Sequence, residues 1–172
     1  MSDSNYSKEK FEEGMADFAS QNYVRSIEHF SEAIKIKPDF SLALKSRGAA
    51  FLRLDKFQDA ISDFTKVVEM DPENARAFHL RGLAFEKFGE NDKALDDFNR
   101  AIALNPSYGV AYHSRAILHT KMGHTDMATE DIQMVAQLTE INIEAFSNNN
   151  NVWRSQQLRL ESMYNDNITM ER

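Results

Sequence analysis

Three arginines and three aspartates recur along the chain at one fixed separation. Arg47, Arg81 and Arg115 lie 34 residues apart, and sixteen residues after each stands an aspartate: Asp63, Asp97 and Asp131. An arginine guanidinium can bind a carboxylate through two parallel hydrogen bonds. Earlier in the chain the equivalent positions hold Glu13 and His29, so acid and base exchange places together. We therefore predict ion pairs between two helices, with a structural role. The alternative is that both side chains face water separately.

Two histidines, His79 and His113, are separated by the same interval, and imidazoles on one face can share a metal ion. No carboxylate or third histidine accompanies them at a spacing typical of metal sites, so we interpret both as unliganded residues of a binding groove. The chain has no cysteine, which excludes disulfides and thiolate metal sites. No nucleophile elbow, phosphate-binding loop or catalytic carboxylate pair is evident. The sequence therefore predicts no metal, no cofactor and no enzymatic activity.

The length and the charge of the chain limit the classes of protein that it can be. A chain of 172 residues forms one compact domain or one short solenoid. Its net charge of −7 disfavours binding to nucleic acid, whose phosphates require clustered lysine and arginine. The sequence has no run of 18 apolar residues and no apolar signal core. We therefore expect a cytoplasmic protein without nucleic-acid or membrane partners.

The interval of 34 residues also governs the small, aromatic and proline residues. It relates Gly14, Gly48 and Gly82 to one another, as it does Pro38, Pro72 and Pro106, Ala60 and Ala94, and Phe64 and Phe98. In these positions the sequence resembles the tetratricopeptide repeat family, over four units: residues 7–40, 41–74, 75–108 and 109–142. The resemblance implies an all-α, right-handed superhelical solenoid built of helix-turn-helix hairpins.

The physical properties of these residues support the same fold. Within each unit the apolar residues recur at spacings of three and four, which is the period of a helix. Small residues at facing positions, such as Gly82 and Ala94, let two antiparallel helices approach closely. Gly89 can adopt the positive φ that a tight turn requires. Pro106 is expected to end the second helix, because proline has no N–H and disfavours helical geometry in the preceding residue.

The first and the fourth unit depart from the pattern. Residues 1–6 precede the first unit and are predicted to be an N-terminal tail. The first unit has Lys10 where the third and fourth units have Phe78 and Tyr112, which suits a terminal repeat with one face in water. The fourth unit has Ala116 in place of glycine and Glu140 in place of proline. Its second helix, expected over residues 126–138, can therefore run on or bend only weakly.

A helical pattern continues beyond the fourth unit. Spacings of three and four define one face of a helix that is apolar except for two amides: Ile143, Phe146, Asn150, Trp153, Gln157, Leu160 and Tyr164. We interpret residues 143–164 as a C-terminal capping helix that covers the last apolar edge, and residues 165–172 as a disordered tail. The asparagines at 148–151 allow a flexible linker instead. The sequence leaves open whether residues 139–164 form a separate helix or continue the preceding one.

The resemblance also implies where a partner binds. In this family the first helices of the hairpins line a concave surface that holds ligands. On this chain the implied lining comprises Phe11, Met15, Phe18, Lys45, Arg53, Arg76, His79, Lys87, His113 and Lys121. It begins apolar and continues mainly basic, in a protein that is acidic overall. We therefore expect a groove for an extended or helical peptide with acidic and apolar residues. The alternative is an ordinary solvated face.

The function favoured by these features is that of a non-catalytic adaptor or scaffold, which binds a protein or peptide partner in the groove. One alternative is self-assembly into a homo-oligomer through the fourth unit, with Met122, Met127 and Met134, and through the predicted helix of Trp153. Another is a regulatory module for a small ligand, although no convergent polar pocket is evident. The sequence names no partner, pathway, organism or oligomeric state.

Some members of the family clamp the C-terminal carboxylate of heat-shock chaperones with lysine, asparagine and arginine side chains. Here apolar or hydroxyl residues occupy four of the clamp positions: Phe11, Met15, Ser46 and Leu80. Arg76 is the one clear match. Because most of the clamp is missing, the sequence does not favour a co-chaperone that binds such tails.

Overall fold

The computed structural model describes residues 3–145, in which all the regular secondary structure is helical. The helices are α1 (Asp3–Ala19), α2 (Tyr23–Ile36), α3 (Ser41–Arg53), α4 (Phe57–Met70), α5 (Ala75–Phe88), α6 (Asn91–Leu104) and α7 (Gly109–Met122). A further helix occupies residues 125–145, up to the last described position. Since α1 begins at Asp3, the predicted N-terminal tail over residues 1–6 is wrong for residues 3–6, which are helical.

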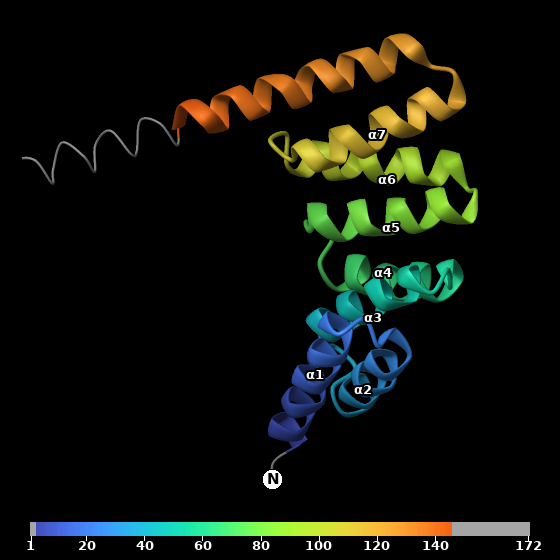
Figure 1. Cartoon of the computed structure of the whole chain (residues 1–172), viewed down its shortest axis with the longest axis vertical. Helices are drawn as coiled ribbons and strands as arrows, with labels where there is room; N and C mark the ends of the chain where they lie inside the picture. The colour runs from blue at the N-terminus through green and yellow to red at the C-terminus, as the bar shows by residue number, and fades with distance from the viewer. Residues whose placement is uncertain (1–2, 146–172) are drawn as a thin grey trace, which may run out of the picture.

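The helices form antiparallel hairpins that stack along the molecule in chain order (Figure 1). α1 pairs with α2, α3 with α4, α5 with α6, and α7 with the helix over residues 125–145. Each second helix also packs on the first helix of the next hairpin. A single hairpin cannot bury its apolar faces, so the stacking is what creates a continuous core. This arrangement is an all-α superhelical solenoid and confirms the predicted fold class.

Close contact within the first three hairpins depends on glycine. A Cβ atom at Gly82 would lie 2.7 Å from the ring of Phe98, a distance that carbon atoms do not tolerate. The same contact occurs in the first two hairpins, at 2.6 and 2.8 Å: Gly14 against Phe30, and Gly48 against Phe64. All three phenylalanines are fully buried. The fourth hairpin has Ala116 and Ile132 at the two equivalent positions, and there Ala116 is buried but Ile132 is exposed, so the close contact of the first three hairpins is not repeated.

The turn inside each hairpin requires one residue with positive φ. That residue is Gln21 in the first hairpin (φ 62°), Asp55 in the second (56°), Gly89 in the third (93°) and Gly123 in the fourth (81°). The four positions are again 34 residues apart. The prediction for Gly89 is confirmed. The first two turns hold the same backbone shape with a side chain present, which is sterically less favourable.

Proline marks the end of the second helix in the first three hairpins. α2, α4 and α6 each end two residues before a proline: Pro38, Pro72 and Pro106. The residue directly before each proline is extended or nearly so, as the ring requires.

The fourth hairpin has Glu140 instead of proline, and its second helix runs through residues 138–145 without a break. The boundary predicted after residue 142 is therefore not a helix end. The rest of the predicted capping helix, with Trp153, and the predicted disordered tail lie outside the described residues.

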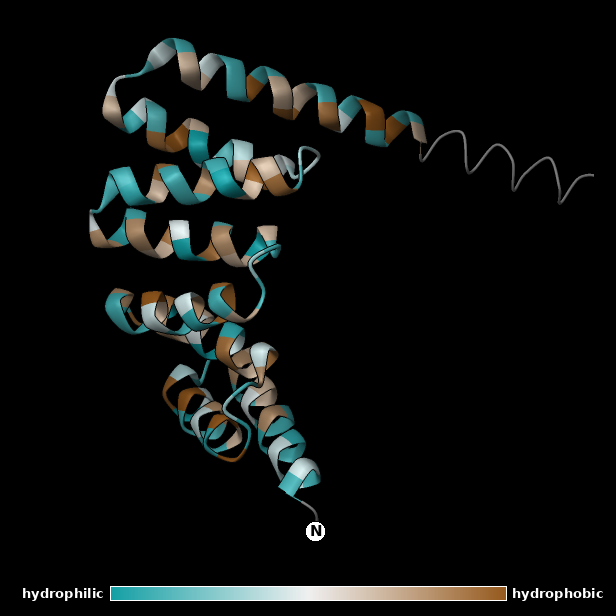
Figure 2. Cartoon of the chain, turned by 180° about the vertical axis from the view of Figure 1, so that it is seen from behind, coloured by the Kyte–Doolittle hydropathy of each residue, from teal (hydrophilic) through white to brown (hydrophobic). Residues whose placement is uncertain are grey.

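The hydrophobic core is divided among the interfaces between neighbouring hairpins and has no single centre. Three buried clusters join neighbouring hairpins: Leu44 and Val67 with Ala77, Phe64 with Ala84, and Phe98 with Leu118. The predicted small residues Ala60 and Ala94 are fully buried in the second and third of these clusters. Hydrophobic and hydrophilic residues alternate along each helix, as expected for elements with one buried face (Figure 2). Within residues 3–145, no helix combines the length and the apolarity needed to cross a membrane.

Candidate functional site

The first helices of three successive hairpins enclose a hollow of about 210 Å³. Its lining comprises Met15 and Phe18 of α1, Leu42, Lys45, Ser46 and Ala49 of α3, and Arg76 and Leu80 of α5. We call this the first hollow. Four of the predicted groove residues meet here: Met15, Phe18, Lys45 and Arg76. The sequence did not reveal that these four, among the predicted residues, share one cavity.

The first hollow combines an apolar floor with two cations. Met15 and Leu42 are 42% and 54% exposed, so the hollow presents large apolar side chains to solvent. Within the described part of the chain, neither Lys45 nor Arg76 takes part in an ion pair. The hydroxyl of Ser46 donates to the sulfur of Met15 at 3.6 Å. The hollow can therefore accept an apolar side chain and hold a neighbouring carboxylate.

His79 does not line the groove, contrary to the sequence-based interpretation. Its side chain is 4% exposed, with Nε2 2.9 Å from Oγ of Ser114 and Nδ1 3.3 Å from the hydroxyl of Tyr108. Burial, with a smaller contribution from the charge of Arg76, lowers the pKa of His79 to about 4. The imidazole is therefore neutral at pH 7 and joins the third hairpin to the fourth. Tyr108, which follows 29 residues after His79, is the sequence feature that could have revealed this buried contact.

Phe11 also lies outside the first hollow. Its ring packs 5.8 Å from the ring of Phe30 and 5.0 Å from that of Phe40, measured between centroids. Phe11 is half-buried by these contacts. It therefore packs the first hairpin against the turn that leads into the second. The structure does not support its assignment as part of the binding site.

The predicted basic residues Arg53, Lys87 and Lys121 are exposed at one repeat position, near the ends of α3, α5 and α7. They do not line the first hollow. The Nζ atom of Lys121 lies 3.5 Å from Oδ1 of Asn91, and that of Lys87 lies 3.9 Å from a carboxylate oxygen of Glu86. These side chains form a row of cations, one on each of three successive hairpins.

His113 lies apart from His79, in a second and larger hollow at the other end of the solenoid. This second hollow has a volume of about 440 Å³ and separates the start of α7 from the end of the helix over residues 125–145. Its lining comprises Ser107, Tyr108, Gly109, Val110, His113, Val135, Leu138, Thr139 and Asn142. The sequence analysis named His113 but did not identify this cavity, because it left open whether the helix continues past residue 138.

The predicted arginine–aspartate pairs are present in the second, third and fourth hairpins. Arg81 donates to both carboxylate oxygens of Asp97, at 2.7 and 2.8 Å. The other two pairs have the same geometry: Arg47 with Asp63, and Arg115 with Asp131. The hydrogen bond from Arg81 to Asp97 raises the pKa of Arg81. The aspartates are buried, so these pairs are structural and unavailable to a ligand.

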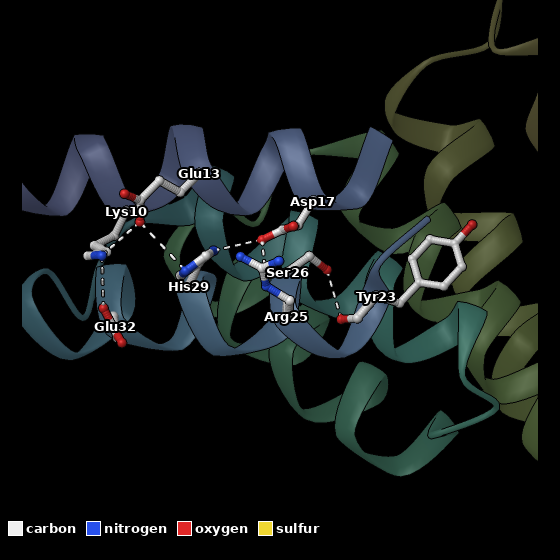
Figure 3. Close-up of polar contacts among 8 residues, drawn as sticks. All are labelled: Lys10, Glu13, Asp17, Tyr23, Arg25, Ser26, His29 and Glu32. Atoms are coloured by element: carbon white, nitrogen blue, oxygen red, sulfur yellow. Dashed lines mark hydrogen bonds and ion pairs between the residues drawn. The ribbon is translucent and has the colours of Figure 1, made fainter. Parts of the chain in front are cut away.

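The first hairpin replaces this pair with a branched network between α1 and α2 (Figure 3). Nδ1 of His29 lies 3.0 Å from Oδ2 of Asp17, closer than Nε2 lies to Glu13, at 3.6 Å. Glu13 itself accepts a 2.7 Å hydrogen bond from Lys10, which raises the pKa of Lys10 and lowers that of Glu13. The predicted contact between Glu13 and His29 is thus present, although Asp17 is the nearer partner of the histidine.

Comparison with known proteins agrees with this geometry. Residues 46–109 match the family model of the tetratricopeptide repeat. Residues 46–109 belong to the tetratricopeptide repeat family, and the hairpins on both sides continue the same fold. A search among curated proteins found no significant match. Within residues 3–145, no three acidic or histidine side chains gather as a metal site.

Solved structures share the fold over most of their length. One is MamA, from residue 41 to its end, of Desulfovibrio magneticus RS-1, with a TM-score of 0.74, 22% identity, and coverage of 78% of this chain and 76% of that one. The Arabidopsis OM64 TPR domain has a TM-score of 0.66 and 29% identity, and the similarity covers 70% and 99% of the two chains. The first TPR of Spaghetti (RPAP3), bound to the HSP90 peptide SRMEEVD, has a TM-score of 0.66, 22% identity and coverage of 70% and 95%.

Proposed function

We propose that this tetratricopeptide repeat protein is a non-catalytic cytoplasmic adaptor that binds a peptide segment of a protein partner in the first hollow. The observation that carries the proposal is the exposed apolar floor beside two unpaired cations, Lys45 and Arg76. Leaving large apolar side chains in water is unfavourable, and such patches are typical of interaction sites. The structure of another tetratricopeptide repeat protein with a bound HSP90 peptide supports a peptide as the class of ligand.

The charge of the chain favours an acidic peptide at this place. The net charge is −7, so most of the surface repels an acidic ligand. Lys45 and Arg76 provide a local positive potential beside the apolar floor. Complementary charge of this kind increases the rate of association and the specificity more than the affinity. The exposed row of Arg53, Lys87 and Lys121 can attract further acidic residues of the same partner.

The lining of the first hollow argues against a chaperone tail as the ligand. Met15, Ser46 and Leu80 stand where the clamp of the family has amide or basic side chains, and all three line the hollow. Only Arg76 supplies a charge expected of the clamp. A carboxylate would therefore find two cations, Arg76 and Lys45, beside a surface that is mostly apolar. An internal segment with a leucine or methionine next to an acidic residue fits this surface better.

The proposed site can be tested by reversing one charge in the full chain. The probe is a fluorescein-labelled peptide with a central Leu-Glu-Glu in a glycine-serine chain, and the readout is fluorescence anisotropy. We expect Arg76→Glu to weaken binding about tenfold, equal to ~1.4 kcal/mol. Lys66→Glu in α4 is the matched control, because Lys66 is exposed and lies on a second helix. Absence of binding to the wild type, or an equal loss in both variants, would contradict the proposal.

Self-assembly through the fourth hairpin is the second candidate function. The helix over residues 125–145 has large apolar side chains that are more than half exposed: Met127, Ile132, Ile141 and Ile143. Met122 is not part of this surface, because it packs against the buried cluster of Phe98 and Leu118. Sedimentation velocity over a range of concentrations tests this candidate. A chain that stays monomeric throughout, and is unaffected by Ile132→Glu, eliminates it.

A further inference from the structure

The turn of each hairpin brings the eleventh and the sixteenth residue of its unit together. In all four units the backbone N–H of the sixteenth residue donates to the carbonyl oxygen of the eleventh, at 2.8 to 2.9 Å: Asn22 to Asp17, Lys56 to Phe51, Glu90 to Phe85 and His124 to His119. One residue with positive φ shapes each of these turns. In the fourth hairpin alone, both of the residues brought together are histidines.

The two imidazoles of the fourth turn face each other through the same ring atom. Nδ1 of His119 lies 3.3 Å from Nδ1 of His124. Zinc–nitrogen bonds are about 2.0–2.1 Å long, so two nitrogens bound to one tetrahedral zinc ion lie about 3.3–3.4 Å apart. The separation in the structure therefore matches one edge of the coordination tetrahedron of zinc.

The protonation of the pair is compatible with metal binding. Burial is the main cause that lowers the pKa of His119, so its ring is neutral at pH 7. Neutral imidazole is the form that binds a metal ion. Without an ion, one ring donates a hydrogen bond to the other through Nδ1. When an ion binds, this proton moves to Nε2 of the same ring, and both Nδ1 lone pairs face the metal.

The other histidines of the chain lie in different surroundings. The two ring nitrogens of His29 point away from each other, toward two different carboxylates. His79 is buried between the third and the fourth hairpin, and His113 lines the second hollow. Among the five histidines, all within residues 3–145, only His119 and His124 have ring nitrogens that converge.

We propose that His119 and His124 form a two-histidine site for a divalent transition-metal cation, and that Zn²⁺ is the ion that fits. Imidazole is a good ligand for zinc, and water molecules complete the tetrahedron. No third acidic or histidine side chain joins the pair within residues 3–145. The proposal revises the sequence-based expectation of no metal, and it does not depend on the proposed function.

The ion cross-links the end of α7 to the beginning of the helix over residues 125–145. His119 is buried and holds one ligand in place, whereas His124 is exposed and lets the ion enter from solvent. The fourth hairpin lacks the close contact of glycine with phenylalanine that joins the helices of the first three. A metal at its turn therefore adds a restraint where the packing is weaker. An ion that binds only the folded chain stabilises it.

The test follows a titration of the full, tag-free chain with Zn²⁺ by NMR at pH 7.5, using spectra that detect the imidazole nitrogens through their ring protons. We expect the Nδ1 signals of His119 and His124 to shift together and to saturate at one equivalent. The signals of His29, His79 and His113 should stay unchanged. Resolving each histidine separately distinguishes this site from weak binding of zinc to surface carboxylates.

Two matched variants assign the ion to the pair. His124→Ala removes an exposed ligand and should weaken zinc binding at least about tenfold in isothermal titration calorimetry, because a single imidazole cannot chelate. His113→Ala removes another exposed histidine and should leave the affinity unchanged. Saturating zinc should raise the Tm of the wild type and of His113→Ala, but not that of His124→Ala.

Three results would overturn the proposal. The first is that zinc leaves the Nδ1 signals of His119 and His124 in place. The second is that His124→Ala binds zinc as tightly as the wild type does. The third is that zinc binds the wild type without raising its Tm, since an ion that cross-links the turn must stabilise the folded chain.

Discussion

In the third hairpin, Arg81 and Asp97 join α5 to α6 through two parallel hydrogen bonds, and within residues 3–145 neither side chain makes a hydrogen bond to another residue. In the first hairpin, by contrast, α1 and α2 meet through a branched network with three carboxylates and three basic groups (Figure 3). The apolar contact is the same in both, glycine against a buried phenylalanine. The comparison indicates that the contact between glycine and phenylalanine is required in both hairpins. The charged groups between the two helices can differ, provided that acidic and basic side chains compensate one another.

The largest expected effect on stability comes from removing the carboxylate of Asp97 in the third hairpin. Removing the carboxylate of Asp17 in the first hairpin should have a smaller effect. Asp97→Ala leaves the guanidinium of Arg81 without its acceptor in a mostly buried place and should lower the free energy of unfolding by about 3 kcal/mol. Asp17→Ala should cost about 1 kcal/mol or less, because Glu13 still lies beside His29. Urea unfolding monitored by circular dichroism measures both values.

A double-mutant cycle sharpens this difference. We expect a coupling energy above about 1 kcal/mol between Arg81 and Asp97, and a smaller one between His29 and Asp17. Equal losses in the two hairpins, or no coupling in the third, would show that a single ion pair and a network hold the helices equally well.

The second prediction concerns the aromatic contacts of the same two hairpins. Phe11 on Phe40 in the first hairpin carries no titratable group, whereas His79 on Tyr108 in the third does. Burial lowers the pKa of His79 to about 4 in the folded state, below its unfolded value of about 6.5. Below pH 6.5 the unfolded chain gains a proton that the folded chain excludes, so stability falls until about pH 4. The loss at pH 4 should be about 3 kcal/mol, because one pKa unit corresponds to ~1.4 kcal/mol.

This contribution is isolated by comparing the pH dependence of urea unfolding between pH 7.5 and 4. The double variant His79→Phe with Tyr108→Phe makes the third hairpin resemble the first and should remove the contribution of His79. Phe11→Leu serves as the control, because it changes packing without changing titration. An unchanged slope in the double variant would mean that other groups cause the acid sensitivity.

The smallest effect should be common to both hairpins. Gly82→Ala places a methyl group 2.7 Å from the ring of Phe98, and Gly14→Ala does the same at 2.6 Å from Phe30. Overpacking of this kind costs typically 1–3 kcal/mol, partly offset by about 1 kcal/mol of helix propensity, so each variant should lose about 1 kcal/mol.

Gly109→Ala is the matched control for these two variants. An added Cβ at Gly109 would meet only Leu138, at 3.8 Å, so thermal unfolding should show no loss of stability. Phe98→Leu should rescue Gly82→Ala in part, because it relieves the clash. Unequal losses at Gly14 and Gly82 would show that the apolar contact differs between the hairpins after all.

The repeat pattern made the helices and their internal contacts predictable. Each of Gly82, Phe98, Pro106 and the pair of Arg81 with Asp97 recurs at equivalent places, and the same geometry follows each time. The groove residues were harder to assign. His79 was interpreted as a groove residue from its place on α5, but its neighbour Tyr108 buries it. Lys45, at the equivalent position, lines the first hollow, and the residue of its unit that corresponds to Tyr108 is Asn74, which caps α5.

By itself, the sequence determined the period, the hairpins and the positions where helices touch, because steric contact within a hairpin depends on residues at constant separations. Only the tertiary structure decided which residues of different hairpins share a cavity. The first hollow needs Met15, Lys45 and Arg76 from three helices, and the second needs the helix to continue past residue 138. Whether each place is open or filled depends on side chains beyond the helix that carries it, such as Tyr108 over His79, and a repeat pattern specifies the place without specifying that contact.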